Sequence, residues 1–162
     1  MIVIEMILVG IFATYFMDLM GSLLVKRKFM QSVIKPEAVG RWFLYMFKGK
    51  FIHKDINKSP ALKNEKLWSF VSHHMIGIAL AGIYLLLEFK EPNILDQIWM
   101  PLIFGIATTV LPWFWMFPSI GLGFLASKSP NKLSIIKTSL VNHINFGLGL
   151  LIWIVSIHRF FQ

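Results

Sequence analysis

Residues 2–25 read IVIEMILVGIFATYFMDLMGSLLV and are followed at once by Lys26, Arg27 and Lys28. A helix of about 20 predominantly apolar residues is long enough to cross a lipid bilayer. The stretch meets this requirement, and the basic triplet is typical of a flank that stops translocation. Because a basic segment before a short apolar core would mark a cleavable secretory signal and neither is present, we expect a helix that stays in the membrane.

Three further apolar stretches of similar length follow, at about residues 67–89, 98–117 and 135–157. Apolar side chains make up 56% of the 162 residues, and the mean hydropathy of +0.66 is too high for a water-soluble domain. We therefore predict an all-α membrane protein. Its single domain, residues 1–162, contains four transmembrane helices, of which residues 2–25 form the first.

Basic residues are distributed unevenly over the segments that connect these spans. Of the 16 Lys and Arg residues, 14 lie in or beside segments 26–66 and 118–134, which share one side of the membrane. The positive-inside rule places both segments in the cytoplasm and both termini outside. Basic flanks of this kind contact anionic lipid headgroups. No recognised nucleic-acid-binding module accompanies the net charge of +8, so we expect no nucleic-acid partner.

The first cytoplasmic segment contains an aromatic stretch between basic residues. Residues 41–48 read RWFLYMFK, and Gly40 and Gly49 bracket them. The stretch is too short to span a bilayer, so its composition predicts an interfacial helix with its rings at headgroup depth. Such a helix would serve as a surface anchor or as a lid over a cytoplasmic-facing site. We expect Arg41 to contact a lipid phosphate.

A short pattern occurs twice in the chain, 70 positions apart. The two copies share Lys58/Lys128, Ser59/Ser129, Pro60/Pro130, Ser69/Ser139, Val71/Val141, His73/His143, Gly77/Gly147 and Leu80/Leu150. These are 8 identities over 23 aligned positions, whereas chance would give about one or two. Each copy runs into a span of the same orientation. The pattern therefore predicts a parallel duplication of a helical hairpin, with His73 and His143 at equivalent positions.

Ionisable residues lie inside three of the four spans at similar depth. Helix rise places Asp18, His73, His74 and His143 about 9–10 Å from the cytoplasmic ends of their helices. Ionisable residues inside a membrane are costly and rarely face lipid. Small and polar residues recur at i+4 steps around Asp18, His73 and His143, so these three should face the bundle interior. His74 should point about 100° away from His73. Glu5 lies near the outer interface, where we expect it to reach water.

This layer of residues fits several kinds of chemistry. His73, His143 and Asp18 offer imidazole nitrogens and a carboxylate that suit a divalent metal ion. His73 and His143 could instead be axial ligands of a haem. An Asp–His chain also suits a proton relay or a polar solute site. A hydrogen-bond network that only fixes helix register is a further interpretation. His53 and Asp55 are candidates for a cytoplasmic extension of the same site.

Several stretches of the chain carry a resemblance to a known family. They are residues 40–42, 53–56, 59–65, 73–74, 112–113, 121–124 and 126–128, together with His143. The chain resembles, over nearly its whole length, small bacterial inner-membrane proteins known as domain-of-unknown-function family 2938. The resemblance implies a four-helix protein of the bacterial inner membrane. It brings no activity, cofactor or catalytic residue, so the site candidates depend on spacing and depth alone.

Three functions follow from these observations, and the sequence does not decide whether the chain is an enzyme. The first is a protein that binds or conducts a small solute, an ion or a proton. It would be a homo-oligomer, because four helices enclose little volume. The second is a membrane-embedded metal or haem enzyme that acts on a lipid-like substrate. The third is a structural or accessory membrane subunit.

Overall fold

A computed structural model describes residues 2–91 and 97–161, and the regular elements of this part of the chain are all helices, without strands. Four helical segments are long and apolar enough to cross a membrane: Ile2–Lys26, Glu65–Lys90, Met100–Ser119 and Lys132–Ser156. The predicted fold class is confirmed. The predicted spans agree with these segments to within a few residues at each end.

The first, second and fourth spans are continuous helices, and the third is built from three pieces. The continuous helices are α1 (Ile2–Lys26), α3 (Glu65–Lys90) and α7 (Lys132–Ser156). The third span consists of α5 (Met100–Ala107), the π-helical turn η2 (Pro112–Met116) and α6 (Phe117–Ser119). Short 3-10 turns are η1 (Ile56–Lys58), η3 (Phe124–Ala126) and η4 (His158–Phe160).

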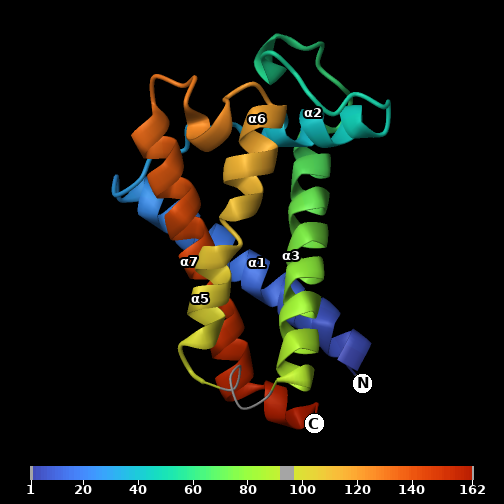
Figure 1. Cartoon of the computed structure of the whole chain (residues 1–162), viewed down its shortest axis with the longest axis vertical. Coiled ribbons are helices and arrows are strands. Elements are labelled where there is room, and N and C mark those ends of the chain that lie inside the picture. Colours follow the sequence, from blue (N-terminus) through green and yellow to red (C-terminus); the bar gives the residue numbers. More distant parts are fainter. Residues whose placement is uncertain (1, 92–96, 162) are drawn as a thin grey trace.

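The break in the third span lies next to Pro112, which has no backbone N–H to donate. The amides of Thr109 and Leu111 donate three residues back, to the carbonyls of Ile106 and Thr108, so the last turn of α5 tightens. The wider turn η2 then continues the span. Proline commonly interrupts a helix in this way because it removes a hydrogen bond and its ring crowds the preceding turn. Figure 1 shows the interruption between α5 and α6.

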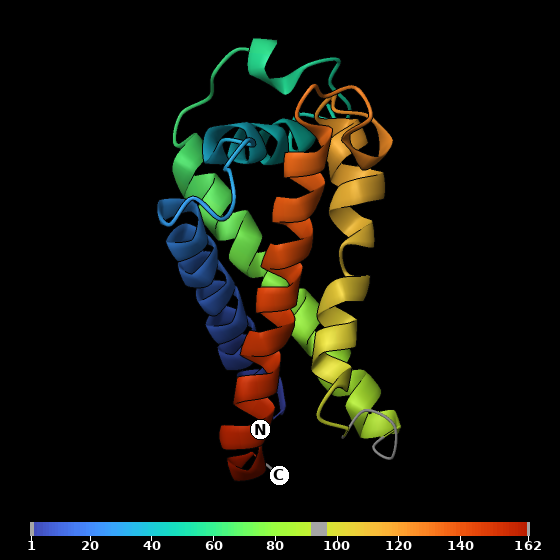
Figure 2. The same cartoon turned by 90° about the vertical axis from the view of Figure 1, so that its left-hand side faces the viewer.

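The four spans form an antiparallel bundle that is covered at one end. Helix α1 packs against α3 and α7, and α5 packs against α7. Both chain ends lie at the end of the bundle opposite to α2 (Figures 1 and 2). The apolar core includes Val9, Ala13, Tyr84, Phe146 and Leu150. Many large apolar side chains on the outer faces of the spans are exposed, which is compatible with contact to a lipid bilayer.

Helix α2 (Pro36–Met46) lies across the end of the bundle and packs against the first turns of α3 (Figures 1 and 2). Pro36 at its start suits the first helical turn, where no intrahelical partner is needed for the backbone N–H. The helix therefore begins earlier than the predicted stretch 41–48 and ends at Met46. Gly40 lets α2 approach α3 closely, because a Cβ there would overlap with the carbonyl of Glu65.

The segment between α2 and α3 folds over the end of the bundle and is held there by backbone hydrogen bonds. The amide of His53 donates to the carbonyl of Ser119 at 2.7 Å, and the amide of Ile56 donates to that of Ile120 at 3.1 Å. Gly121 adopts a φ of +96°, and a Cβ at this position would overlap with the carbonyl of Lys54. The two connecting segments at this end thus form one cap over α2 and α6.

Candidate functional site

A cavity of about 380 Å³ lies among α1, α3, η2 and α7, beneath α2. Its polar lining includes Thr14, Asp18, Ser72, His73, Ser139 and His143. Its apolar lining includes Trp42, Leu111, Trp115, Met116, Phe117 and Phe146. The structure therefore brings Asp18, His73 and His143 to one cavity.

Asp18 on α1 and His73 on α3 are partners across the cavity wall. The Nδ1 atom of His73 lies 3.3 Å from Oδ1 of Asp18. The side chains keep exposed fractions of 42% for His73 and 43% for Asp18 although both lie within apolar spans. Both residues line the cavity.

His143 on α7 is held by Thr108, which follows α5. Its Nδ1 lies 2.7 Å from the Thr108 hydroxyl, and that hydroxyl donates to the carbonyl of Gly105 at 2.6 Å. In a continuing helix the Gly105 carbonyl would accept from the amide of Thr109, but that amide donates to Ile106. The Thr108 hydroxyl has one hydrogen, which it donates to the Gly105 carbonyl. Its oxygen therefore accepts from Nδ1–H of His143. In the neutral imidazole, Nε2 of His143 is then a hydrogen-bond acceptor.

Other hydroxyl groups of the cavity also donate to protein atoms. The Thr14 hydroxyl donates to the carbonyl of Gly10 at 2.7 Å, and that of Ser72 donates to Ser69 at 3.1 Å. Ser139 instead accepts from the indole N–H of Trp113 at 3.2 Å, so its own hydrogen stays available. The orientation of these groups is thus set by the protein before any ligand arrives.

His74 does not share the cavity with His73. Its Nδ1 lies 3.0 Å from the carbonyl of Phe70, and its ring lies 4.1 Å from the ring of Phe70, centroid to centroid. The residue is buried, and it is not among those that line the cavity. This position agrees with the expected turn of about 100° between neighbouring helical residues. His74 packs within the protein and offers no ring atom to a molecule in the cavity.

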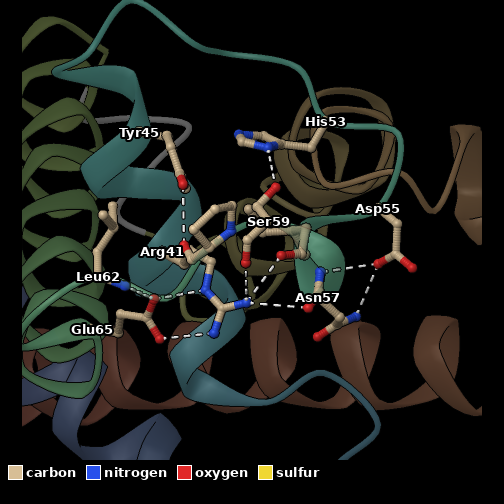
Figure 3. A network of polar contacts seen from close by, with 10 residues as sticks. Arg41, Tyr45, His53, Asp55, Asn57, Ser59, Leu62 and Glu65 are labelled. Carbon is tan, nitrogen blue, oxygen red and sulfur yellow. Dashed lines mark hydrogen bonds and ion pairs between the residues drawn. The ribbon is translucent and has the colours of Figure 1, made fainter.

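His53 and Asp55 lie in the cap, away from the walls of the cavity (Figure 3). Nδ1 of His53 lies 2.9 Å from the Ser59 hydroxyl, and Asp55 accepts from the amide of Asn57 at the start of η1. Burial, together with the charge of Lys50, lowers the pKa of His53 from its usual value. Neither residue is brought to Asp18, so both hold the fold of the cap.

Arg41 contacts protein groups on every side, so the expected contact with a lipid phosphate is wrong. Its guanidinium forms a bidentate ion pair with Glu65, with Nε–Oε1 at 2.6 Å and Nη2–Oε2 at 3.0 Å (Figure 3). Nη1 donates to the carbonyls of Ile56 and Ser59 at 3.1 and 3.0 Å. The hydrogen bond to Glu65 raises the pKa of Arg41 above its usual value. The basic side chain therefore fastens the cap to α3.

Helix α2 provides part of the cavity wall. Trp42, on its buried face, lines the cavity and meets Trp115 of η2 edge-on, with ring centroids 5.4 Å apart. The indole N–H of Trp42 donates to the carbonyl of Phe51 at 3.1 Å. The lid, one of the two roles considered for this helix, stays a prediction that this position is compatible with.

The candidate metal ligands are not gathered into one coordination sphere. Among the described residues, no three His, Asp or Glu side chains lie close enough together to hold a metal ion. Asp18 is paired with His73, whereas Nδ1 of His143 is directed to Thr108. Axial ligation of a haem by His73 and His143 stays a prediction.

A second polar cluster, which sequence reasoning missed, lies at the opposite end of the bundle. Glu5 is 3% exposed, so the expectation that it reaches water is wrong. Its Oε1 accepts from the indole N–H of Trp153 at 3.2 Å and lies 2.6 Å from Nδ1 of His158. Nε2 of His158 lies 3.5 Å from Glu88, which is also buried. Two acidic residues within apolar spans were a signal that could have found this cluster.

The fold is all-helical, and four helical segments long and apolar enough to cross a membrane surround a capped cavity with polar and apolar side chains on its wall. The chain belongs to the family described as protein of unknown function (DUF2938), whose family model matches residues 7–157. This match confirms the resemblance inferred from the sequence. No curated protein and no solved structure matches the chain.

Proposed function

We propose that this protein binds a small solute in the cavity beneath α2 and passes it between the membrane interior and the cytoplasmic side. The observation that carries the proposal is the convergence of Asp18, His73 and His143 on one cavity. An ionisable side chain inside a membrane is costly, and such residues commonly mark the path of a substrate or an ion.

The size and the lining of the cavity support a small-molecule site. Its volume of about 380 Å³ lies near the lower end of the range for ligand pockets, about 300–1,000 Å³. Such pockets are mostly apolar with a few polar groups that orient the ligand. Here the apolar groups include Leu111 and Met116, and the orienting groups are Asp18, His73 and His143.

The side of the membrane is part of the proposal. The α2 end carries most of the basic residues, so the positive-inside rule places it in the cytoplasm of a bacterial cell and both termini outside the inner membrane. Contact of the basic segments with anionic headgroups and assembly into a homo-oligomer are further predictions. Helix α2, with Trp42 against Trp115, would then be a lid that a solute passes on the cytoplasmic side.

Equivalent contacts in the two hairpins support the proposed duplication. A Cβ at Gly77 would overlap with Thr14 of the preceding span, and a Cβ at Gly147 would lie 2.7 Å from the carbonyl of Pro101 of its preceding span. Likewise His73 pairs with Asp18, and His143 pairs with Thr108. In each hairpin the repeat glycine permits close packing and the repeat histidine contacts the span before it. Duplication of one ancestral hairpin would produce these equivalent contacts in both halves of the protein.

Thiol labelling tests whether water and solutes reach the cavity. The chain has no cysteine, so a single introduced thiol is the only reactive one. Ser139→Cys places the thiol on the cavity wall, and Val110→Cys places it on an exposed face of the third span outside the cavity. Both variants are treated in membrane vesicles with a charged, membrane-impermeant methanethiosulfonate reagent.

We expect Ser139→Cys to react and Val110→Cys to stay unlabelled. The reaction should occur when the reagent is on the cytoplasmic face and not when it is on the other face. If Ser139→Cys is as unreactive as Val110→Cys while the protein is folded, the cavity is closed to solutes and the proposed function is wrong. Reaction only from the outer face would overturn the proposed orientation.

A further inference from the structure

We infer that the ligand of the cavity is a small amphipathic amine, bound as its ammonium ion. The ammonium group would lie between Asp18 and His143, and the apolar body would lie against Leu111 and Trp115. This inference rests on the proposed function, because it names the chemical class of the solute that the cavity takes. Three features of the cavity carry it: its charge, its hydrogen-bonding groups and its aromatic wall.

In the described part of the chain, the wall of the cavity carries one carboxylate and no Lys or Arg although the chain is basic, and His73 lies 3.3 Å from that carboxylate. The chain has 16 Lys and Arg residues and 8 Asp and Glu residues. Among the residues that the structure describes, no Lys or Arg lines the cavity, and Asp18 is the one acidic residue on its wall. An anionic ligand would face this carboxylate without a Lys or Arg partner, whereas a cation would be stabilised by it. The cavity therefore selects against anions.

The cavity offers hydrogen-bond acceptors from several helices. The hydroxyls of Thr14 and Ser72 donate to backbone carbonyls, and that of Thr138 donates to the carbonyl of Gln31. Their oxygens keep lone pairs but no free hydrogen. His143 directs Nδ1–H at Thr108, so Nε2 accepts, and an ionised Asp18 has only acceptor atoms. Ser32, Ser69, Ser139 and Asn142, which also line the cavity, keep donor hydrogens.

An ammonium group matches this set, because it has three donor hydrogens and no acceptor. A divalent metal would also seek acceptors, but it needs several ligands within one small coordination sphere. No three described His, Asp or Glu side chains are close enough for that. Separate hydrogen bonds from one ammonium group impose no such closeness. The arrangement therefore favours an organic cation over a metal ion.

The apolar walls and the size of the cavity define the rest of the ligand. Trp42 and Trp115 line the cavity, as do Leu111 and Met116. Aromatic faces attract cations and also pack against apolar groups. A cavity of about 380 Å³ takes a ligand the size of a single substituted ring or a short alkyl chain.

Three probes of similar size and different charge test this inference. They are 2-phenylethylamine, the neutral 2-phenylethanol and the anion 3-phenylpropionate, titrated calorimetrically into purified protein in detergent micelles. Asp18→Asn removes the charge from the cavity. Asp55→Asn is the matched control, because Asp55 lies in the cap and asparagine also caps a helical turn. Empty micelles give the background from partitioning of each probe.

We expect saturable binding of 2-phenylethylamine to the wild-type protein and to Asp55→Asn. Asp18→Asn should weaken that binding by about tenfold or more, since a charge-assisted hydrogen bond is lost. The anion should show no saturable binding. If Asp18→Asn does not fold, His143→Leu decides, because it removes a second acceptor and should also weaken amine binding.

Four outcomes would overturn the inference. The first is binding of 3-phenylpropionate at least as tight as that of the amine, and the second is equal binding of 2-phenylethanol and the amine, which would leave a solute site without a preference for cations. The third is amine binding unchanged in Asp18→Asn or, if that variant does not fold, in His143→Leu, and the fourth is no saturable amine binding at all. The proposed function itself is judged separately by labelling of Ser139→Cys, so the two failures can be told apart.

Discussion

Arg41 and Glu65 form a bidentate ion pair that joins the middle of α2 to the first residue of α3. The same guanidinium donates to the carbonyls of Ile56 and Ser59, and Glu65 also accepts from the amide of Leu62 at 2.6 Å. Two side chains therefore hold α2, the turn η1 and the start of a span in one arrangement (Figure 3). The position of α2 above the cavity depends on this pair.

We predict that Arg41→Ala destabilises the protein by about 3 kcal/mol, because it leaves the Glu65 carboxylate buried without its cation. Arg41→Lys should restore only part of this loss, since an ammonium group cannot replace a bidentate contact together with two carbonyl contacts. Thermal unfolding and limited proteolysis of residues 47–64 measure the effect.

Lys66→Ala is the matched control for Arg41, because its ion pair with Glu37 is exposed and exposed pairs contribute little. An Arg41→Ala protein as stable and as resistant to protease as Lys66→Ala would show that the cap does not need the buried pair.

The cap should also loosen in mild acid, because His53 is buried in it. The lowered pKa means that the folded protein takes up a proton on His53 less readily than the unfolded chain. Stability is then highest above the usual histidine value of 6.5 and falls as the pH drops below it, since the unfolded state binds more protons there. Amide hydrogen exchange of residues 50–60 at pH 7.5 and pH 5.5, with each rate divided by the intrinsic rate of the unstructured chain at that pH, should show weaker protection at the lower pH.

His53→Asn should remove most of this pH dependence, because asparagine can contact Ser59 without titrating. A difference between the two pH values that is equally large in His53→Asn would assign the effect to another group.

The second polar cluster gives a prediction about the opposite end of the bundle. Glu5→Ala removes the acceptor for the indole N–H of buried Trp153 and the partner of partly buried His158. We expect a loss of about 3 kcal/mol in stability. A double-mutant cycle with His158→Ala should show a coupling energy of about 1 kcal/mol or more, measured by chemical or thermal unfolding. Additive effects within error would mean that the two residues do not interact.

Most of the fold could be predicted because its signals are local. An apolar stretch of bilayer length, such as residues 2–25, needs no partner to be recognised, and the basic residues that follow it mark its end. Asp18, His73 and His143 were placed together by helix rise alone, and all three line the cavity. Depth and helical face are properties that one sequence carries.

The parts that could not be predicted depend on contacts between distant segments. The sequence around Arg41 indicates a contact with lipid, because it does not record that Glu65, 24 residues away, pairs with the guanidinium of Arg41. The position of Glu5 near the end of its span indicates exposure to water, because the sequence does not record its contacts with Trp153 and His158. No periodicity in the chain records such pairs, and only the folded arrangement shows them.

The repeat glycines offer a last prediction, about how closely the spans pack. A Cβ at Gly147 would lie 2.7 Å from the carbonyl of Pro101 and 3.0 Å from Cα of Leu102, which are backbone atoms that cannot move aside. A Cβ at Gly82 would meet only the side chain of Met6, at 3.5 Å or more. Both glycines lie within long helices, where alanine is otherwise preferred by about 1 kcal/mol.

Gly147→Ala should therefore destabilise the protein by about 1–3 kcal/mol, whereas Gly82→Ala should be neutral or stabilising. Thermal unfolding of the two variants in the same detergent compares them directly. If Gly147→Ala is as stable as Gly82→Ala, then α5 and α7 do not approach each other as closely as this arrangement requires.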